Sequence, residues 1–206
     1  MSTLQGGPNY NNIKYIQIGT QNWATTNLDT ACYINGDSIP QITNNADWAN
    51  LTTGAWCYYN NDFRNGAIYG KLYNWYAVND PRGIAPQGWH VPTDAEWNTM
   101  TKYLDASVDT TCQCWSGNNI GTQLKSTSGW NNGGNGTNSS GFAGLPGGYR
   151  YDYGNFNGVG YYGFWWSSSG DLTTDAWNRF LKNNDSIVHR YDFNKSFGFS
   201  IPLVRD

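Results

Sequence analysis

From Trp177 to Asp206 the sequence alternates between two kinds of residue, and this alternation constrains the fold more than any other feature of the chain. Within Ser186–Phe193 the alternation has a period of two, which is the side-chain period of a β-strand. A strand here would place Val188 and Arg190 on one face and the other kind of residue on the opposite face. The sequence therefore predicts a strand whose two faces have different roles.

One kind of residue has the character of a structural framework: Arg179, Leu181, Val188, Arg190, Lys195, Gly198 and Val204. The other kind mixes amide, acid, imidazole and aromatic side chains, and we name it the predicted contact set: Asn178, Phe180, Asn183, Asp185, Ile187, His189, Tyr191, Phe193, Asn194 and Phe197. A face without shared chemistry is poorly suited to a core or to a reaction. It suits contact with another molecule, with the aromatic members as binding hot spots.

The composition bounds the class of protein. A length of 206 residues predicts a single domain over 1–206, since about 100 to 200 residues per domain is usual. Charged residues make up 13%, the net charge is −3 and basic residues do not cluster, which argues against nucleic acid as a partner. Aromatic residues at 17% and 25 glycines predict a loop-rich domain that buries large rings.

No segment of the sequence has the apolar length of a membrane span, so we expect no membrane insertion. The start, Met1–Pro8, lacks the charged and apolar parts of a signal peptide, and we expect none in the chain as given.

The cysteines are Cys32, Cys57, Cys112 and Cys114. Their even number is compatible with disulfides, and three pairings are open. Cys112 and Cys114 lack both the Cys-x-x-Cys spacing and the further ligands of a redox or metal site. We therefore expect structural cysteines, free or bridged.

Strand patterns occur near both ends of the chain. Ile13–Trp23 alternates like a strand that turns at Gly19, and Ala55–Tyr59 is a second short candidate. Late strands separated by turns are predicted to form an antiparallel sheet: Phe164–Ser169, Asp175–Lys182, Ser186–Phe193 and Phe199–Val204. Pro202 predicts an edge position or a strand end within the last of these.

Two helices are expected before this sheet, besides a brief one around Ala46–Leu51. Apolar residues at helical spacing predict the first over Tyr69–Asn79. The second begins at Thr93, because Thr93 and Glu96 have the spacing of a capping box and Asp94 suits a helix N-terminus.

The middle of the chain, Asp105–Gly148, is rich in Gly, Asn, Ser and Thr and predicts long irregular loops. We expect Leu124, Trp130 and Phe142 to pin them to the core. Two helices packed on an antiparallel sheet with such loops give an α+β fold.

A series of motifs resembles one family, in order along nearly the whole chain: Ile18–Leu28, Gly70–Val78, Gly88–Trp97, Gly141–Arg150, Phe164–Ser169 and Gly198–Asp206. These motifs are similar to those of the Fibrobacter succinogenes major paralogous domain family. The resemblance implies a C-type lectin-like fold related to that of formylglycine-generating enzymes. The chain departs from the family pattern at Ile201–Leu203, which puts the pairing of the last strand in question.

Some members of this family are variable proteins of diversity-generating retroelements, in which miscopied template adenines change Asn codons near the C-terminus. Every member of the predicted contact set can be reached from an AAC codon, whereas Lys182 and Lys195 cannot. The resemblance therefore implies a variable region at about 177–197. We expect Trp165 and Tyr161 to join its surface.

The resemblance implies a non-enzymatic protein that displays a diversified ligand-binding surface for phage adsorption or bacterial surface attachment. Its partner would be a host-surface protein or glycan, its location a virion or a bacterial cell surface, and its oligomeric state is open. We expect no cofactor, and nothing in the sequence supports a structural calcium ion. The alternative is a carbohydrate-binding or structural domain of a bacterial surface protein, without retroelement diversification.

Catalysis and calcium binding find little support in the sequence. The late cysteine pair of formylglycine-generating enzymes is missing, because no cysteine follows Cys114. For His90, next to the start of a helix, we expect a structural hydrogen-bonding role. The nearest fragments of a calcium site, Asn79–Pro81 and Asn183–Asp185, are interpreted as solvated loops, and we expect no metal site.

Overall fold

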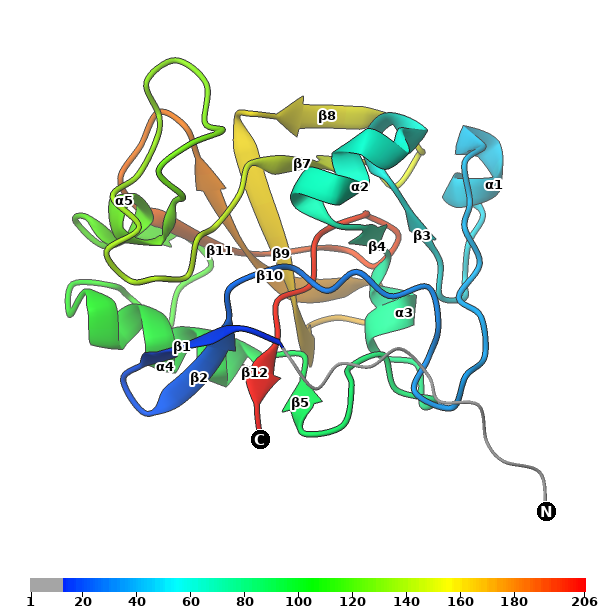
Figure 1. Cartoon of the computed structure of the whole chain (residues 1–206), viewed down its shortest axis with the longest axis horizontal. Helices are drawn as coiled ribbons and strands as arrows, with labels where there is room; N and C mark the ends of the chain where they lie inside the picture. Colours follow the sequence, from blue (N-terminus) through cyan, green and yellow to red (C-terminus); the bar gives the residue numbers. More distant parts are fainter. Residues whose placement is uncertain (1–12) are drawn as a thin grey trace.

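The longest strands form a six-stranded sheet with the order β6-β11-β10-β9-β7-β8 (Figure 1). The computed structural model describes residues 13–206, so the segment Met1–Pro8 lies outside the described residues. The strands are β6 Trp115–Ser116, β7 Gly147–Arg150, β8 Phe156–Val159, β9 Tyr162–Gly170, β10 Asp175–Lys182 and β11 Val188–Asn194. Neighbours run antiparallel, except β7 and β9, which are parallel.

Two smaller sheets join distant parts of the chain. One has the order β1-β2-β12-β5, with β1 Tyr15–Ile18, β2 Gln21–Ala24, β5 Trp89–His90 and β12 Val204–Arg205. The other pairs β3 Trp56–Cys57 with β4 Leu72–Tyr73. The predicted early strand is confirmed as the hairpin β1–β2, which turns at Gly19 with a φ of 62°. Strand β12 lies between β2 and β5, so the first and last described strands share one sheet.

The helices are short apart from α4: α1 Asn45–Ala49, α2 Phe63–Tyr69, α3 Trp75–Val78, α4 Asp94–Leu104 and α5 Ile120–Leu124, with a 3₁₀ turn at Tyr59–Asn61. The predicted start of α4 is confirmed, because Thr93 and Glu96 form the capping box and Asp94 lies in the first turn. Within residues 13–206 no helix is long and apolar enough to cross a membrane. Few helices and mainly antiparallel sheets make this an α+β fold.

The predicted helix over Tyr69–Asn79 is wrong. Helix α2 ends at Tyr69 because Gly70 has a φ of 77°, and the chain then pairs in β4 with β3. The side chain of Asn74 caps the separate helix α3 by accepting a hydrogen bond from the Ala77 amide. The apolar residues of Tyr69–Asn79 are spaced as in one helix, but they belong to three different elements. These elements are the end of α2, the two-residue strand β4 and the short helix α3.

The late strands are confirmed with one exception. Strand β10 has the predicted bounds, β9 contains Phe164–Ser169, and β11 begins two residues later than expected. The predicted strand Phe199–Val204 is wrong, since Phe199 and Ser200 form only isolated bridges and β12 begins at Val204. The expectation from Pro202 is confirmed, because proline has no amide hydrogen to donate to a ladder and the strand starts only beyond it.

The irregular middle of the chain is confirmed and lies beside α5 at the upper left of Figure 1. Its expected anchors Leu124, Trp130 and Phe142 are all buried in one apolar cluster with Trp97 and Trp165. Two short elements, β6 and α5, interrupt the loops. The rings therefore hold the segment although little of it is helix or strand.

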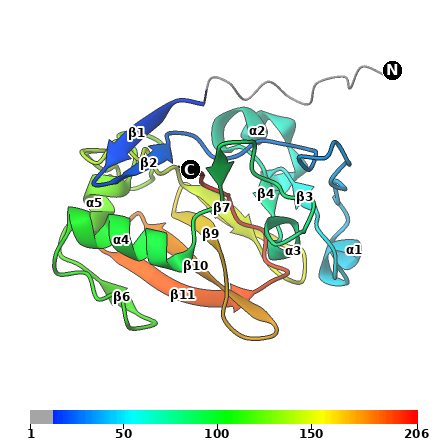
Figure 2. The same ribbon diagram turned by 90° about the horizontal axis from the view of Figure 1, so that it is seen from below.

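The large sheet has an apolar cluster on each face. Figure 2 shows α4 beside β10 and β11. On one face α4 and α5 cover Trp165, Leu181 and Val188. On the other face Phe164, Trp166 and Phe180 pack with residues of α3, β3 and β4. The strands β9, β10 and β11 are thus central to both clusters, although the second face is only partly covered near β11.

His90 has the structural role that we expected. Its Nδ1 lies 2.7 Å from Asp206 Oδ1 and its Nε2 lies 2.7 Å from Glu96 Oε1, so it ties β5 to α4 and to Asp206. Burial alone would lower the pKa of His90, but the hydrogen bonds to Asp206 and Glu96 outweigh it and raise the pKa. Protonated His90 therefore favours the folded state.

The variant His90→Gln is expected to lose stability mainly at mildly acidic pH. The unfolded imidazole has a pKa of about 6.5, so the contribution is fully present below about pH 6.5 and disappears as the pH rises through the higher folded-state pKa. The measurement is the Tm of both proteins from about pH 5.5 to about pH 9. A difference in Tm that widens with rising pH would contradict this role.

Candidate functional site

One face of the hairpin β10–β11 gathers most of the predicted contact set. In the strand register Asn178 lies opposite Tyr191 and Phe180 lies opposite His189, while Phe193 lies opposite Ala176. Directly opposite residues of an antiparallel pair project to the same side, so these side chains share one face. We name this surface, including Phe197, the aromatic face. The predicted separation from Val188 and Arg190 is confirmed, because Val188 belongs to the cluster under α4 and Arg190 bonds to α4.

A row of rings crosses the sheet on this face, with one ring from each of five neighbouring strands: Trp115, His189, Phe180, Phe164 and Tyr149, on β6, β11, β10, β9 and β7. Successive ring centroids are 6.2, 4.3, 4.6 and 4.8 Å apart. The row continues from Tyr149 through Tyr151 to Tyr153, at 4.9 and 4.6 Å. Aromatic contacts of this kind stabilise beyond their buried area.

Part of the predicted contact set is buried, which corrects the expectation that these side chains contact a ligand directly. The exposed fractions are 0% for Asn178, 7% for Phe180 and 3% for His189. Phe180 is stacked between Phe164 and His189. Asn178 donates from Nδ2 to the Tyr191 carbonyl at 2.9 Å, and His189 Nε2 lies 2.9 Å from Asp185 Oδ2. Phe180 and His189 are covered because neighbouring strands supply rings on both sides of each.

The remaining members of the predicted contact set form an outer, half-buried layer: Asn183, Asp185, Ile187, Tyr191, Phe193, Asn194 and Phe197. Phe193 and Phe197 have ring centroids 5.3 Å apart and both pack against Phe199. Tyr191 lies over Phe180 at 5.9 Å. The face therefore has an inner layer that supports and an outer layer that solvent, or a partner, can reach.

Lys125 fixes the turn between β10 and β11, a role that no pattern in the sequence indicated. Its Nζ donates to the carbonyls of Lys182 at 3.1 Å and Asp185 at 2.8 Å, with a longer contact to that of Asn183. The side chain is buried, and burial lowers its pKa although Asp185 acts in the opposite direction. The turn that presents Asn183, Asp185 and Ile187 is held by a buried cation.

The hairpin is fixed from its other face by Asp94. Arg179 on β10 donates to Asp94 Oδ1 at 2.7 Å, and Arg190 on β11 donates to Asp94 Oδ2 at 2.8 Å. Arg179 also reaches Asn98 Oδ1 at 2.6 Å, and Arg190 stacks over Trp177 at 3.6 Å. Burial lowers the pKa of Arg179 to about 10, which leaves it charged at neutral pH. One carboxylate at the start of α4 thus joins both strands.

Exposed rings outside the predicted contact set extend the aromatic face. Trp115 is 58% exposed and Tyr153 is 53% exposed, and the sequence interpretation missed both. The spacing of Tyr149, Tyr151 and Tyr153 was a signal that could have found the second. Tyr161 is exposed, but Trp165 is not part of this surface. Its ring is buried on the opposite face, where its Nε1 donates to Asn27 Oδ1.

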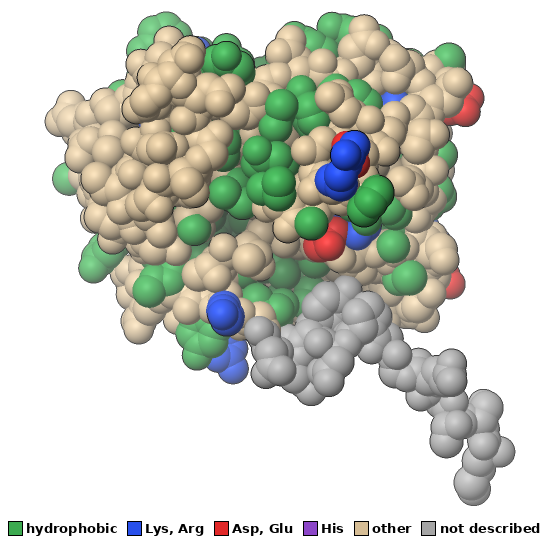
Figure 3. All heavy atoms as spheres, turned by 45° about the horizontal axis from the view of Figure 1, so that its top comes forward, with side chains coloured by type: hydrophobic (Ala, Val, Ile, Leu, Met, Phe, Trp, Pro, Cys, Tyr) green, Lys and Arg blue, Asp and Glu red, His purple; other side chains and the backbone are tan. Residues whose placement is uncertain are grey.

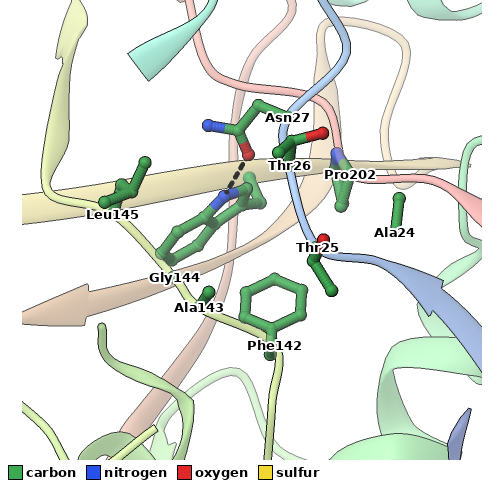
Figure 4. Close-up of a pocket in the computed structure, with 10 residues that line it drawn as sticks. Ala24, Thr25, Thr26, Asn27, Phe142, Ala143, Gly144, Leu145 and Pro202 are labelled. Atoms are coloured by element: carbon green, nitrogen blue, oxygen red, sulfur yellow. Dashed lines mark hydrogen bonds between the residues drawn. The ribbon is translucent and has the colours of Figure 1, made fainter. Parts of the chain in front are cut away.

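A small hollow lies beside Trp165 and does not belong to the aromatic face. Figure 4 shows it between Ala24–Asn27, Phe142–Leu145 and Pro202. Its volume of about 10 Å³ is enough for roughly one water molecule. Figure 3 shows hydrophobic side chains gathered in a shallow depression near the middle of one face of the molecule, with several charged side chains beside it.

The remaining side chains that can react or bind a metal ion are those of the cysteines and of the His, Asp and Glu residues. Cys112 and Cys114 form a disulfide directly before β6, whereas Cys32 and Cys57 are free. Burial raises the pKa of the Cys57 thiol to about 12, as for a structural cysteine. Within residues 13–206 no group of three or more His, Cys, Asp or Glu side chains is arranged to hold a metal ion.

These features define an α+β domain that carries a broad aromatic surface on one face of its largest sheet. Residues 16–205 match the model of the Fibrobacter succinogenes major domain, so the chain belongs to this family, as its motifs indicated. No curated protein and no solved structure matches the chain.

Replacement of Asp94 by Ala is expected to cost about 3 to 5 kcal/mol of folding stability, because two buried or half-buried guanidinium groups lose their shared carboxylate. The control Asp37→Ala removes an exposed carboxylate that also pairs with an arginine, and should leave stability nearly unchanged. Urea denaturation measures both. Equal losses would show that the Asp94 triad does not support the hairpin.

The two layers of the aromatic face should differ in their response to truncation. Phe180→Ala opens a cavity between Phe164 and His189 and is expected to cost about 3 to 5 kcal/mol. Tyr191→Ala removes a half-buried ring and should cost about 1 kcal/mol. The measurement is again urea denaturation. A greater loss for Tyr191→Ala than for Phe180→Ala would invert the assignment of the layers.

Proposed function

We propose that this protein is a non-enzymatic binding protein that holds a protein ligand on its aromatic face. The observation that carries the proposal is that the two faces of the hairpin β10–β11 have different roles. One face presents half-buried and exposed rings, and the other is fixed by Asp94, Arg179 and Arg190. Rings of this kind supply much contact area for little loss of side-chain entropy, which suits a protein interface.

The rigid support behind the face favours binding through exchangeable side chains. Substitutions of Tyr191, Phe193 or Phe197 leave the contacts of Arg179 and Arg190 untouched, because those side chains project to the opposite side. A site built on strands and held by buried polar contacts loses little order when its outer residues change. This arrangement supports a surface that varies between related proteins.

A C-type lectin-like fold is part of the proposal. It is supported by the sheet that joins the first and last described strands, by the helix α4 packed on the large sheet and by the long irregular segment beside α5. The family resemblance of the motifs gave the same expectation.

We further propose that the variable region at about 177–197 is diversified by a retroelement. The reachable codons of the predicted contact set support this origin. Lys195, which AAC cannot reach, has a fixed role, since its Nζ donates to the carbonyls of Leu172 and Thr173 at 3.1 and 2.7 Å. The protein would then act in phage adsorption or bacterial surface attachment, on a virion or a bacterial cell surface.

The gene and its neighbourhood test the retroelement directly. The expected findings are codons ending in C at the variable positions, an imperfect repeat with AAC at the same positions and a reverse-transcriptase gene nearby. A neighbourhood without a repeat and a reverse transcriptase would contradict diversification.

Binding itself is tested on a panel of intact bacterial cells with the labelled protein. The triple variant Tyr191→Ala, Phe193→Ala, Phe197→Ala should lose binding, whereas Phe63→Ala, which removes an exposed ring on α2, should keep it. Protease treatment of the cells should abolish binding. If periodate oxidation of glycans abolishes it instead, the carbohydrate-binding alternative holds, and binding by the triple variant would contradict the aromatic face as the site.

A further inference from the structure

We propose that Asn132 is a site of covalent modification, at which the side chain is attacked by the next backbone amide and converted to aspartate and isoaspartate. The chain contains five Asn-Gly pairs, which begin at Asn35, Asn65, Asn132, Asn135 and Asn157. Glycine leaves the attacking amide least hindered, because it has no side chain. All five pairs are therefore chemically susceptible, and the structure separates Asn132 from the other four. This inference does not depend on the proposed function.

The reaction needs only water besides the chain itself. The Gly133 amide nitrogen loses its proton and forms a bond to Cγ of Asn132, and ammonia leaves to give a succinimide ring. Water then adds to one of the two ring carbonyls and opens the ring, which gives aspartate or isoaspartate. The net change replaces a side-chain amide by a carboxylate. The rate rises with pH, because the deprotonated amide is the nucleophile.

The peptide group between Asn132 and Gly133 can rotate without losing a contact. The two residues have positive φ angles of 55° and 73° and lie in the middle of a tight turn, closed by the hydrogen bond from the Gly134 amide to the Asn131 carbonyl at 3.0 Å. Both are exposed, and a Cβ added to Gly133 would meet no atom within 4 Å. Among the described residues, none forms a hydrogen bond with the Asn132 side chain, its carbonyl or the Gly133 amide.

Hydrogen bonds hold both reacting groups in the two other loop pairs. At Asn35 the side-chain oxygen accepts from the Asp37 amide at 3.0 Å, and the following glycine amide donates to a backbone carbonyl at 3.0 Å. At Asn135 the side-chain oxygen accepts from the Trp130 amide at 2.9 Å, and the following glycine amide again donates to a carbonyl at 2.9 Å. In both pairs attack would first have to break these hydrogen bonds.

The remaining two pairs lie in regular secondary structure. Asn65 belongs to α2, and its Nδ2 donates to the Tyr59 carbonyl at 3.0 Å. Asn157 lies in β8 opposite Tyr149, and the glycine that follows it, Gly158, is buried. In either element the amide reaches the side chain only after local unfolding, which lowers the rate by the population of the open state.

The modification would place a new carboxylate beside the turn that joins β10 and β11. Asn183 Nδ2 donates to the Asn131 carbonyl at 3.2 Å, and a Cβ added to Gly134 would lie 2.4 Å from the Asn183 carbonyl oxygen. Loop and turn are therefore in close contact. Isoaspartate also lengthens the main chain of the loop by one methylene, so the change reaches an edge of the predicted contact set.

The test compares the native protein with the same protein unfolded in guanidinium chloride, both kept at the same temperature and mildly alkaline pH. Peptide mass spectrometry gives the rate of deamidation at each Asn-Gly pair, and labelling with an isoaspartate methyltransferase identifies the product. In the native protein we expect Asn132 to react at least about tenfold faster than the other four pairs, whereas in the unfolded chain all five should react at similar rates.

Two variants serve as matched controls. Asn132→Gln should remove the fast reaction, because glutamine closes the larger ring much more slowly, whereas Asn135→Gln should leave the rate at Asn132 unchanged. Faster reaction at another pair of the native protein, or similar rates at all five, would overturn the assignment. So would an intact Asn132 in the native protein at a time when the unfolded chain has reacted.

Discussion

The shared carboxylate of Asp94 is the interaction on which the rest of the structure depends. It stands in the first turn of α4, where a carboxylate is favoured by the helix dipole, and it accepts hydrogen bonds from Arg179 and Arg190. These arginines lie on neighbouring strands, so one contact sets the distance of α4 from the sheet and the register of the hairpin. The same Arg190 also holds the turn before Trp115. Helix, hairpin and edge strand are therefore fixed relative to one another through a single polar centre.

The proposed binding surface gains from this arrangement because its outer rings are separate from the contacts that stabilise the hairpin. Those contacts are the Asp94 hydrogen bonds on the opposite face and the inner row of rings beneath the outer layer. The buried position of Phe180 and the half-buried position of Tyr191 arise from the row of rings, not from the strand itself. Stacked rings on β9, β10 and β11 form a continuous floor for the outer layer. That floor keeps Tyr191 and Phe193 half-exposed, where their chemistry is available to a partner.

Local signals made much of this structure predictable from the sequence. The capping box fixed the start of α4, and the period-two pattern identified β10, β11 and their two faces. The helix expected over Tyr69–Asn79 failed because Tyr73 pairs with Trp56 in β3 and with Phe199 near the C-terminus. Burial of Phe180 and His189 could not be predicted, since it depends on the rings of Phe164 and Trp115 from other strands. Trp115 was missed because its strand has two residues within an irregular segment.

Burial of the inner layer would limit what the proposed diversification can achieve. Asn178, Phe180 and His189 occupy positions that an adenine-directed mechanism would vary together with the outer layer. A small polar residue in place of Phe180 would leave a cavity between two rings, and a charged one would lose its hydration without gaining a partner. Such variants would fold poorly and would be lost before selection for a ligand. Under the proposed diversification, the functional repertoire would therefore be narrower than the codons allow, and it would be concentrated in the turn and in the outer rings.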